Sequence, residues 1–85
     1  DYSLTKGAIK SFTIALSKEV AEYNVRVNCV SPGNIEPDNR YPEISYMNRS
    51  GSYRECAQVV CFLASEKASF VTGCNYTVDG GRKKI

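Results

Sequence analysis

One helical pattern lies between two short apolar strands, and this order restricts the fold of the chain more than any other feature. The first strand pattern, Val25-Arg26-Val27-Asn28-Cys29-Val30, ends at Ser31-Pro32-Gly33, where a proline disfavours a continued ladder. The second, Cys74-Asn75-Tyr76-Thr77-Val78, ends at Asp79-Gly80-Gly81. A helix that connects two neighbouring strands of one sheet leaves those strands parallel. The sequence therefore predicts a β-α-β unit with strands at 25–33 and 74–78.

The helix between these strands begins with a capping box. Ser52 is placed to cap its N-terminus, and Glu55 is placed to reach back to the Ser52 backbone N–H. Apolar side chains follow at i, i+3, i+4 and i+7: Cys56, Val59, Val60 and Leu63. These signals predict a helix over residues 52–66.

Another helical pattern precedes the first strand. Apolar residues recur at spacings of three and four and form one stripe: Ile9, Phe12, Leu16, Val20 and Tyr23. Small residues beside the stripe would allow another helix to approach closely: Gly7, Ala8, Ser11 and Ala15. Asn24 tolerates the left-handed conformation that often ends helices, so we expect a helix over residues 1–24.

The segment 34–51 has turn-forming residues and no sustained period. A long irregular segment in a compact domain is usually either functional or disordered, and the aromatic Tyr41 and Tyr46 argue against plain disorder. Two parallel strands alone leave two unpaired edges and do not make a stable sheet. We therefore expect an α/β chain whose strands belong to a larger sheet.

Tyr2 and Lys6 are four positions apart at the start of the first helical pattern, so they would lie on one face of a helix. A free tyrosine has a pKa of about 10, and a neighbouring cation lowers that pKa. The pair could then act as a general acid and base near neutral pH. Taken alone, the spacing is a weak signal and favours a tyrosine that simply packs against the stem of an exposed lysine.

Composition excludes several classes of protein. The 85 residues carry a net charge of +2, too little to support nucleic-acid binding. No apolar run approaches the roughly 20 residues of a membrane span, and a cytoplasmic location is expected in the absence of a targeting signal. The four cysteines lack the spacing of a zinc site, so we expect small buried side chains and no metal: Cys29, Cys56, Cys61 and Cys74.

The motifs occur in a familiar order: Tyr2-Ser3-Leu4-Thr5-Lys6, the first strand with its Ser31-Pro32-Gly33 end, Phe62-Leu63-Ala64-Ser65, Val71-Thr72-Gly73, and Val78-Asp79-Gly80-Gly81. Together they resemble the C-terminal part of short-chain dehydrogenases/reductases. The resemblance covers nearly the whole chain and is weakest between residues 34 and 52. It implies the C-terminal part of a Rossmann-like, doubly wound parallel sheet, in the order helix, strand, substrate-lid loop (34–51), helix and strand.

The resemblance also implies roles for particular residues. Tyr2 would exchange a proton with the substrate oxygen of an alcohol or carbonyl compound, and Lys6 would hold the nicotinamide ribose of NAD or NADP. The segment that packs on the nicotinamide would be Pro32, Gly33, Asn34 and Ile35. Tyr41, Tyr46 and Met47 would be either substrate-lining residues or simply packed loop residues.

The chain departs from the family pattern in two ways. Pro37 stands where the family commonly has a threonine that contacts the cofactor. The glycine-rich dinucleotide turn and the catalytic serine and asparagine of the family are not among these residues. We therefore expect a C-terminal segment that binds little cofactor and is inactive alone, and that forms homo-oligomers or associates with a missing N-terminal half. The alternative is a truncated, non-catalytic module for oligomerisation or interaction.

Overall fold

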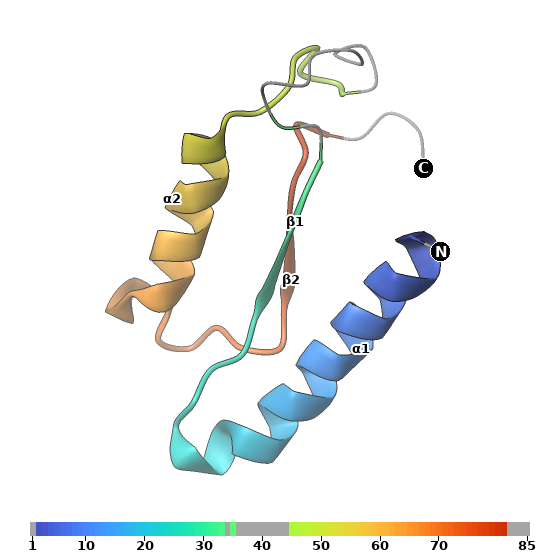
Figure 1. Cartoon of the computed structure of the whole chain (residues 1–85). Coiled ribbons are helices and arrows are strands. Elements are labelled where there is room, and N and C mark those ends of the chain that lie inside the picture. The colour runs from blue at the N-terminus through green and yellow to red at the C-terminus, as the bar shows by residue number, and fades with distance from the viewer. Residues whose placement is uncertain (1, 34, 36–44, 82–85) are drawn as a thin grey trace.

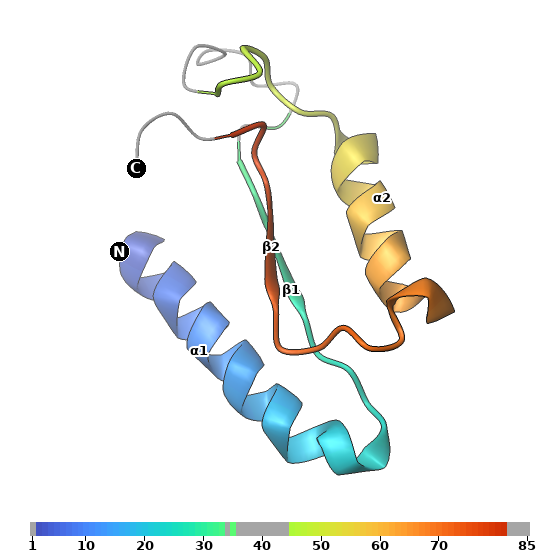
Figure 2. The same ribbon diagram turned by 180° about the vertical axis from the view of Figure 1, so that it is seen from behind.

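The computed structural model describes residues 2–33, 35 and 45–81, and it shows two helices on opposite sides of a pair of strands (Figures 1 and 2). In chain order the elements are α1 (Tyr2–Val20), the 3-10 turn η1 (Ala21–Tyr23), β1 (Cys29–Pro32), α2 (Tyr53–Ala64), the 3-10 turn η3 (Glu66–Ala68) and β2 (Asn75–Val78). The expected α/β class and the parallel pairing are confirmed.

The two strands pair in parallel, with Cys29 beside Asn75 and Pro32 beside Val78. The sequence predicted that Ser31-Pro32-Gly33 ends the ladder, whereas Pro32 is still paired within it. The Cys29 N–H donates to Cys74 O and the Gly33 N–H donates to Val78 O, both at 2.9 Å. Alternate residues of a strand direct their N–H groups to the same side, so Pro32 occupies a position whose nitrogen faces away from β2. The ladder therefore loses no hydrogen bond although proline has no backbone N–H.

Residues 25–28 are not part of the ladder, although the sequence predicted a strand from residue 25. Side chains replace the backbone pairing here. The Thr72 hydroxyl accepts from the Val27 N–H at 3.0 Å, and the Asn28 amide donates to Val71 O and accepts from the Cys74 N–H at 3.0 and 3.1 Å. The Gly73 N–H also donates to Val27 O at 2.7 Å. These bonds join residues 27–28 to residues 71–74, at the amino ends of β1 and β2, without a regular strand ladder.

Helix α1 ends as the sequence predicted, with Asn24 in the left-handed conformation (φ 60°, ψ 38°). Its buried side differs from the apolar stripe. Thr13 and Ser17 are buried, whereas Phe12 and Tyr23 are more than half exposed. The Thr13 and Ser17 hydroxyls donate to carbonyls of the preceding turn at 2.8 and 2.7 Å, so burial leaves neither hydroxyl unsatisfied.

Ser17 lies where a small residue is needed. A Cβ added to Gly73 would approach the Ser17 Oγ to 2.8 Å, so the helix and this loop are in close contact. The small side chains of α1 thus allow a close approach, but at this point the neighbour is a loop and not a helix.

The capping box of α2 is confirmed. The Glu55 N–H donates to the Ser52 hydroxyl at 3.1 Å, and the Ser52 N–H donates to the Glu55 carboxylate at 2.9 Å. Of the four apolar residues on its predicted face, Leu63 is buried, Cys56 and Val59 are half-buried and Val60 is half exposed. The helix stops at Ala64, and Ser65 then caps η3.

Arg26 binds the C-terminal end of α2. Its guanidinium donates to Leu63 O at 2.7 Å, Ala68 O at 2.8 Å and Ser65 O at 3.2 Å. The last carbonyls of a helix have no partner within the helix and carry partial negative charge. A cation that bonds them joins α2 and η3 to the residues just before β1.

Apolar burial is slight in the part of the chain that the structure describes. Leu63 and Ala68 are the buried apolar residues there, while large side chains such as Leu4, Phe12 and Phe70 are exposed. The prediction of four buried cysteines was wrong for Cys61, which is exposed, and the other three are half-buried. Across the described ranges, the model has no helix with the length and apolar character of a membrane span.

Candidate active site

Lys6 lies at the carboxyl end of β1. It lines a pocket of about 170 Å³ together with two neighbours on α1 and three residues of β1: Thr5, Ile9, Val30, Ser31 and Pro32. Tyr2 opens α1 one helical turn before Lys6, and its side chain lies outside the described part of the structure. The fold thus brings Lys6 and Pro32, two of the predicted site residues, to one place. Ser31 and Thr5 are additions that the sequence did not single out.

The segment after β1 is held close to the end of β2. The Gly33 N–H bonds to Val78 O, and a Cβ added to Gly33 would come within 2.6 Å of the Asp79 Cβ. No side chain fits at position 33, so glycine is required there. Ile35 forms an isolated parallel bridge with Gly51. Asn34 and Tyr41, which were also predicted site residues, lie outside the described residues.

Tyr46 and Met47 do not line the Lys6 pocket. They are 71% and 59% exposed and lie against the turn that follows β2. Met47 instead borders a larger cavity of about 380 Å³ near the N-terminus of α2, whose other walls include Glu55, Val59 and Val78. Both hollows are lined by residues at or next to the carboxyl ends of the two strands, where ligands bind in open parallel sheets.

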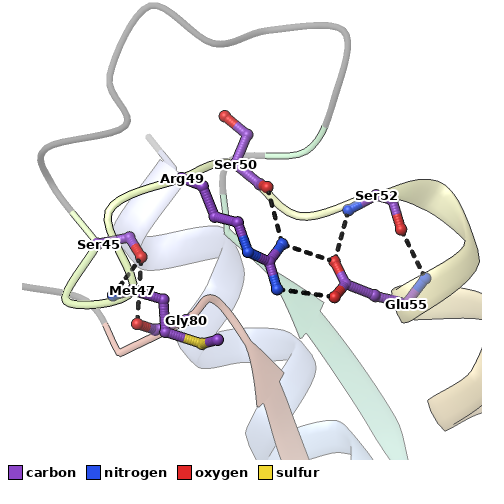
Figure 3. Close-up of polar contacts among 7 residues, drawn as sticks. All are labelled: Ser45, Met47, Arg49, Ser50, Ser52, Glu55 and Gly80. Carbon is purple, nitrogen blue, oxygen red and sulfur yellow. Dashed lines mark hydrogen bonds and ion pairs between the residues drawn. The ribbon is translucent and has the colours of Figure 1, made fainter.

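An ion pair borders this larger cavity (Figure 3). Arg49 bonds both carboxylate oxygens of Glu55, at 3.0 and 2.9 Å, and also donates to Ser50 O at 3.2 Å. The hydrogen bonds from Arg49 and from the Ser52 N–H lower the pKa of Glu55 to about 2, and Glu55 in turn raises the pKa of Arg49. Glu55 was predicted only as a helix cap, because its bond to Arg49 has no sequence signature.

Glu55 and Tyr76 are poorly suited to act as the proton-transfer group. Glu55 is ionised at neutral pH and stays paired. Desolvation, with a smaller effect of Cys74, raises the pKa of Tyr76 and keeps its phenol protonated. Within residues 2–33, 35 and 45–81, no group of three or more His, Cys, Asp or Glu side chains could hold a metal ion.

The Lys6 pocket is suited to one part of a dinucleotide. An ammonium group carries three donors, a type that suits sugar hydroxyls, while the Ser31 hydroxyl donates to the Asn75 side chain at 2.7 Å. A volume of about 170 Å³ accommodates a group the size of a ribose and is too small for a whole dinucleotide. The size of this pocket and the presence of Lys6 are compatible with a sugar, the group that the family resemblance implied for this lysine.

Comparisons with known proteins give relatives along nearly the whole chain. The family model described as enoyl-(acyl carrier protein) reductase matches residues 1–83. The 3-oxoacyl-[acyl-carrier-protein] reductase of Aquifex aeolicus is 44% identical over 91 residues, which cover 95% of this chain and 37% of the relative. Dehydrogenase/reductase SDR family member 4 of Bos taurus is 40% identical and is matched over 94% of this chain and 33% of its own length.

Solved structures of related reductases have the same fold. A crystal structure of a 3-oxoacyl-[acyl-carrier protein] reductase with bound NAD from Brucella melitensis superposes with a TM-score of 0.90 at 38% identity, covering 99% of this chain and 34% of that one. This chain thus spans about a third of the length of the relatives that it matches. The chain belongs to the short-chain dehydrogenase/reductase family.

Proposed function

We propose that this chain carries the proton-transfer part of an NAD(P)-dependent oxidoreductase that interconverts alcohols and carbonyl compounds. The observation that carries the proposal is the position of Lys6. It follows Tyr2 by one turn of α1 and lines a pocket with Ser31 and Pro32 at the carboxyl end of β1. The family relatives, which include reductases by name, support the same reading.

In this proposal each residue has a distinct task. When bound, the nicotinamide supplies or accepts the hydride at the substrate carbon. In the reducing direction the Tyr2 hydroxyl donates its proton to the substrate oxygen and becomes a phenolate. The Lys6 ammonium stabilises that phenolate, which lowers the pKa of Tyr2, and also donates to the ribose hydroxyls. Gly33 and Ile35 belong to the segment that faces the nicotinamide.

We further propose that the 85-residue chain is inactive alone. Its residues include no glycine-rich phosphate-binding turn, and the Lys6 pocket holds only a ribose-sized group. Purified chain incubated with NADH or NADPH and a panel of carbonyl compounds, including a 3-oxoacyl thioester, should show no turnover. Clear turnover by the pure chain would refute this part of the proposal.

The catalytic part is tested by a graft. This chain would replace the matching region of the Aquifex aeolicus reductase, whose other residues supply the remainder of the site. We expect reductase activity that falls about 10²- to 10⁴-fold in the Tyr2→Phe variant, the usual contribution of a general acid. Lys6→Met should cause a similar loss, whereas Lys10→Met, an exposed lysine one turn further along α1, should not.

Equal activity of the Lys6→Met and Lys10→Met grafts would contradict the role of Lys6. An inactive graft that is folded and binds NAD or NADP would contradict the proposed function of the chain as a whole.

A second function, as a module for association, is favoured by the exposed apolar surface. Phe70 is fully exposed, and the outer side of α1 carries Leu4, Phe12 and Ile14 with exposures of 76%, 65% and 47%. Among the residues that the structure describes, neither outer edge of the two-stranded sheet is paired with a further strand. We propose that the chain forms homo-oligomers or binds the rest of the family domain. Sedimentation that shows a compact, stable monomer would contradict this.

A further inference from the structure

Ser45 has an unusual environment for a serine in a loop. Ser45 is only 4% exposed, and its hydroxyl makes two hydrogen bonds (Figure 3). It donates to Gly80 O at 3.1 Å and accepts from the Met47 N–H at 3.1 Å. The hydroxyl therefore joins two segments that are 35 residues apart in the chain.

Backbone bonds run alongside this hydroxyl. The Tyr46 N–H donates to Gly81 O at 2.6 Å, and the Met47 N–H donates to Gly80 O at 3.0 Å. Tyr46 and Met47, which were predicted to be either substrate-lining or packed loop residues, are thus fixed through their backbone to the turn after β2. Their side chains remain more than half exposed and available for contact.

The turn has no room for side chains on this side. Gly80 and Gly81 have φ values of 65° and 78°, a conformation that favours glycine. A Cβ on Gly80 would come within 2.6 Å of the Ser45 Oγ, and one on Gly81 within 3.3 Å of the Tyr46 side chain. The contact between Ser45 and the turn is therefore close and specific.

The same turn also touches the segment after β1. Asp79 packs against Gly33, and its carboxylate accepts from the Gly81 N–H at 2.9 Å. One turn, residues 79–81, thus contacts Gly33 on one side and Tyr46 with Met47 on the other. In the proposed function Gly33 belongs to the nicotinamide side of the site, and the family resemblance offered Tyr46 and Met47 as candidates for its substrate side.

We propose that Ser45 is a positioning residue for substrate recognition, an inference that rests on the proposed function. Its hydroxyl holds Tyr46 and Met47 on the turn after β2, and this turn sets their distance from Gly33. Loss of the hydroxyl removes both bonds and leaves the Gly80 carbonyl with one donor fewer. Tyr46 and Met47 are then less well placed, and the substrate binds more weakly.

The test compares Ser45→Ala with Ser45→Thr, which keeps a hydroxyl, and with Ser69→Ala, an exposed serine after η3. Hydrogen exchange of the Tyr46 and Met47 amides is measured by mass spectrometry in the 85-residue chain and in the graft. Substrate KM and kcat are measured in the graft. For Ser45→Ala we expect about tenfold faster exchange and an about tenfold higher KM, with kcat changed less than threefold. Ser45→Thr should restore both values, and Ser69→Ala should change neither.

The possible results are distinguishable. Unchanged exchange in Ser45→Ala would overturn the proposal, as would faster exchange with an unchanged KM. If Ser45→Ala lowers both kcat and the melting temperature while KM stays constant, the role of Ser45 is merely structural. This result would also overturn the proposal. If the wild-type graft is folded and binds NAD or NADP but is inactive, the proposed function fails and the substrate role fails with it. The exchange measurement would still decide whether Ser45 holds Tyr46 and Met47 on the turn.

Discussion

Replacement of Arg26 by methionine should destabilise the chain strongly. Methionine keeps most of the apolar stem but removes all three hydrogen bonds to the end of α2 and η3. A hydrogen bond to a charged group contributes about 1.5–3 kcal/mol net. Because the site is only partly buried and the three bonds share one group, the lower value applies and the contributions do not simply add. We expect a loss of about 3 kcal/mol.

This loss is large for a chain of this size. Because apolar burial is slight, the low end of the range for native proteins applies, about 0.05 kcal/mol per residue, which gives 85 residues a stability of about 4 kcal/mol. With a urea dependence of about 1 kcal/mol per molar, typical of small proteins, the unfolding midpoint should fall by about 3 M. The measurement is urea unfolding followed by far-ultraviolet circular dichroism.

Two controls accompany Arg26→Met. Arg54→Met removes an exposed arginine of α2 and should change the free energy of unfolding by less than about 0.5 kcal/mol. Arg26→Lys keeps the charge but offers one point instead of a planar fork, so it should recover only part of the loss. If the free energies of unfolding of Arg26→Met and Arg54→Met differ by less than about 1 kcal/mol, the hydrogen bonds from Arg26 to the end of α2 and to η3 contribute little to stability.

Two further predictions concern the ion pair and the glycines. The folded-state pKa of Glu55 is lowered from 4.5 to about 2, so its contribution to stability is complete above about pH 4.5 and disappears as the pH falls towards 2. The stability advantage of the wild type over Glu55→Gln, measured by thermal unfolding, should therefore narrow across this interval; a constant difference would argue against the ion pair. Gly73→Ala should cost about 2 kcal/mol in urea unfolding, because its φ is +74° and the new Cβ would approach the Ser17 Oγ to 2.8 Å. Gly7→Ala, on an open side of α1, should instead stabilise by about 1 kcal/mol, and the reverse order would refute the packing argument.

Local signals predicted the elements of this chain well. The capping box of α2 depends on Ser52 and Glu55, three residues apart, and the end of α1 depends on the intrinsic tolerance of Asn24 for positive φ. Such features depend on neighbouring residues, so they can be identified from the sequence. The parallel pairing followed from the order of the elements, since a helix between two neighbouring strands leaves few other arrangements.

The buried side of α1 could not be predicted in the same way. Periodicity counts apolar residues, whereas Thr13 and Ser17 are polar residues that can be buried because their hydroxyls bond carbonyls of their own helix. The direction of the Pro32 nitrogen depends on which edge of β1 is paired, which is a property of the sheet. Neither fact is present in a short stretch of sequence.

The contacts that support the candidate site were also hidden, because they are long-range. Ser45 and Gly80 are 35 residues apart, and neither residue type indicates the other. Arg49 and Glu55 are close in the chain, but their bond requires that the loop turn back at the start of α2. The sequence therefore indicated Lys6 and Gly33 through the family resemblance, and it indicated nothing about the residues that hold the surrounding loop.

The structure places stability and the proposed chemistry at opposite ends of the strands. At the amino end, Arg26 and Asn28 bind the end of α2 and the loop before β2, close to the buried Leu63 and Ala68. At the carboxyl end, Lys6 lines its pocket with Pro32, and the turn after β2 contacts Gly33 and Ser45. Substitutions at the amino end should therefore change unfolding with little effect on substrate KM in a folded graft. Substitution of Ser45 should instead raise the substrate KM with little effect on unfolding. It changes the position of the exposed Tyr46 and Met47 rather than the burial of apolar residues.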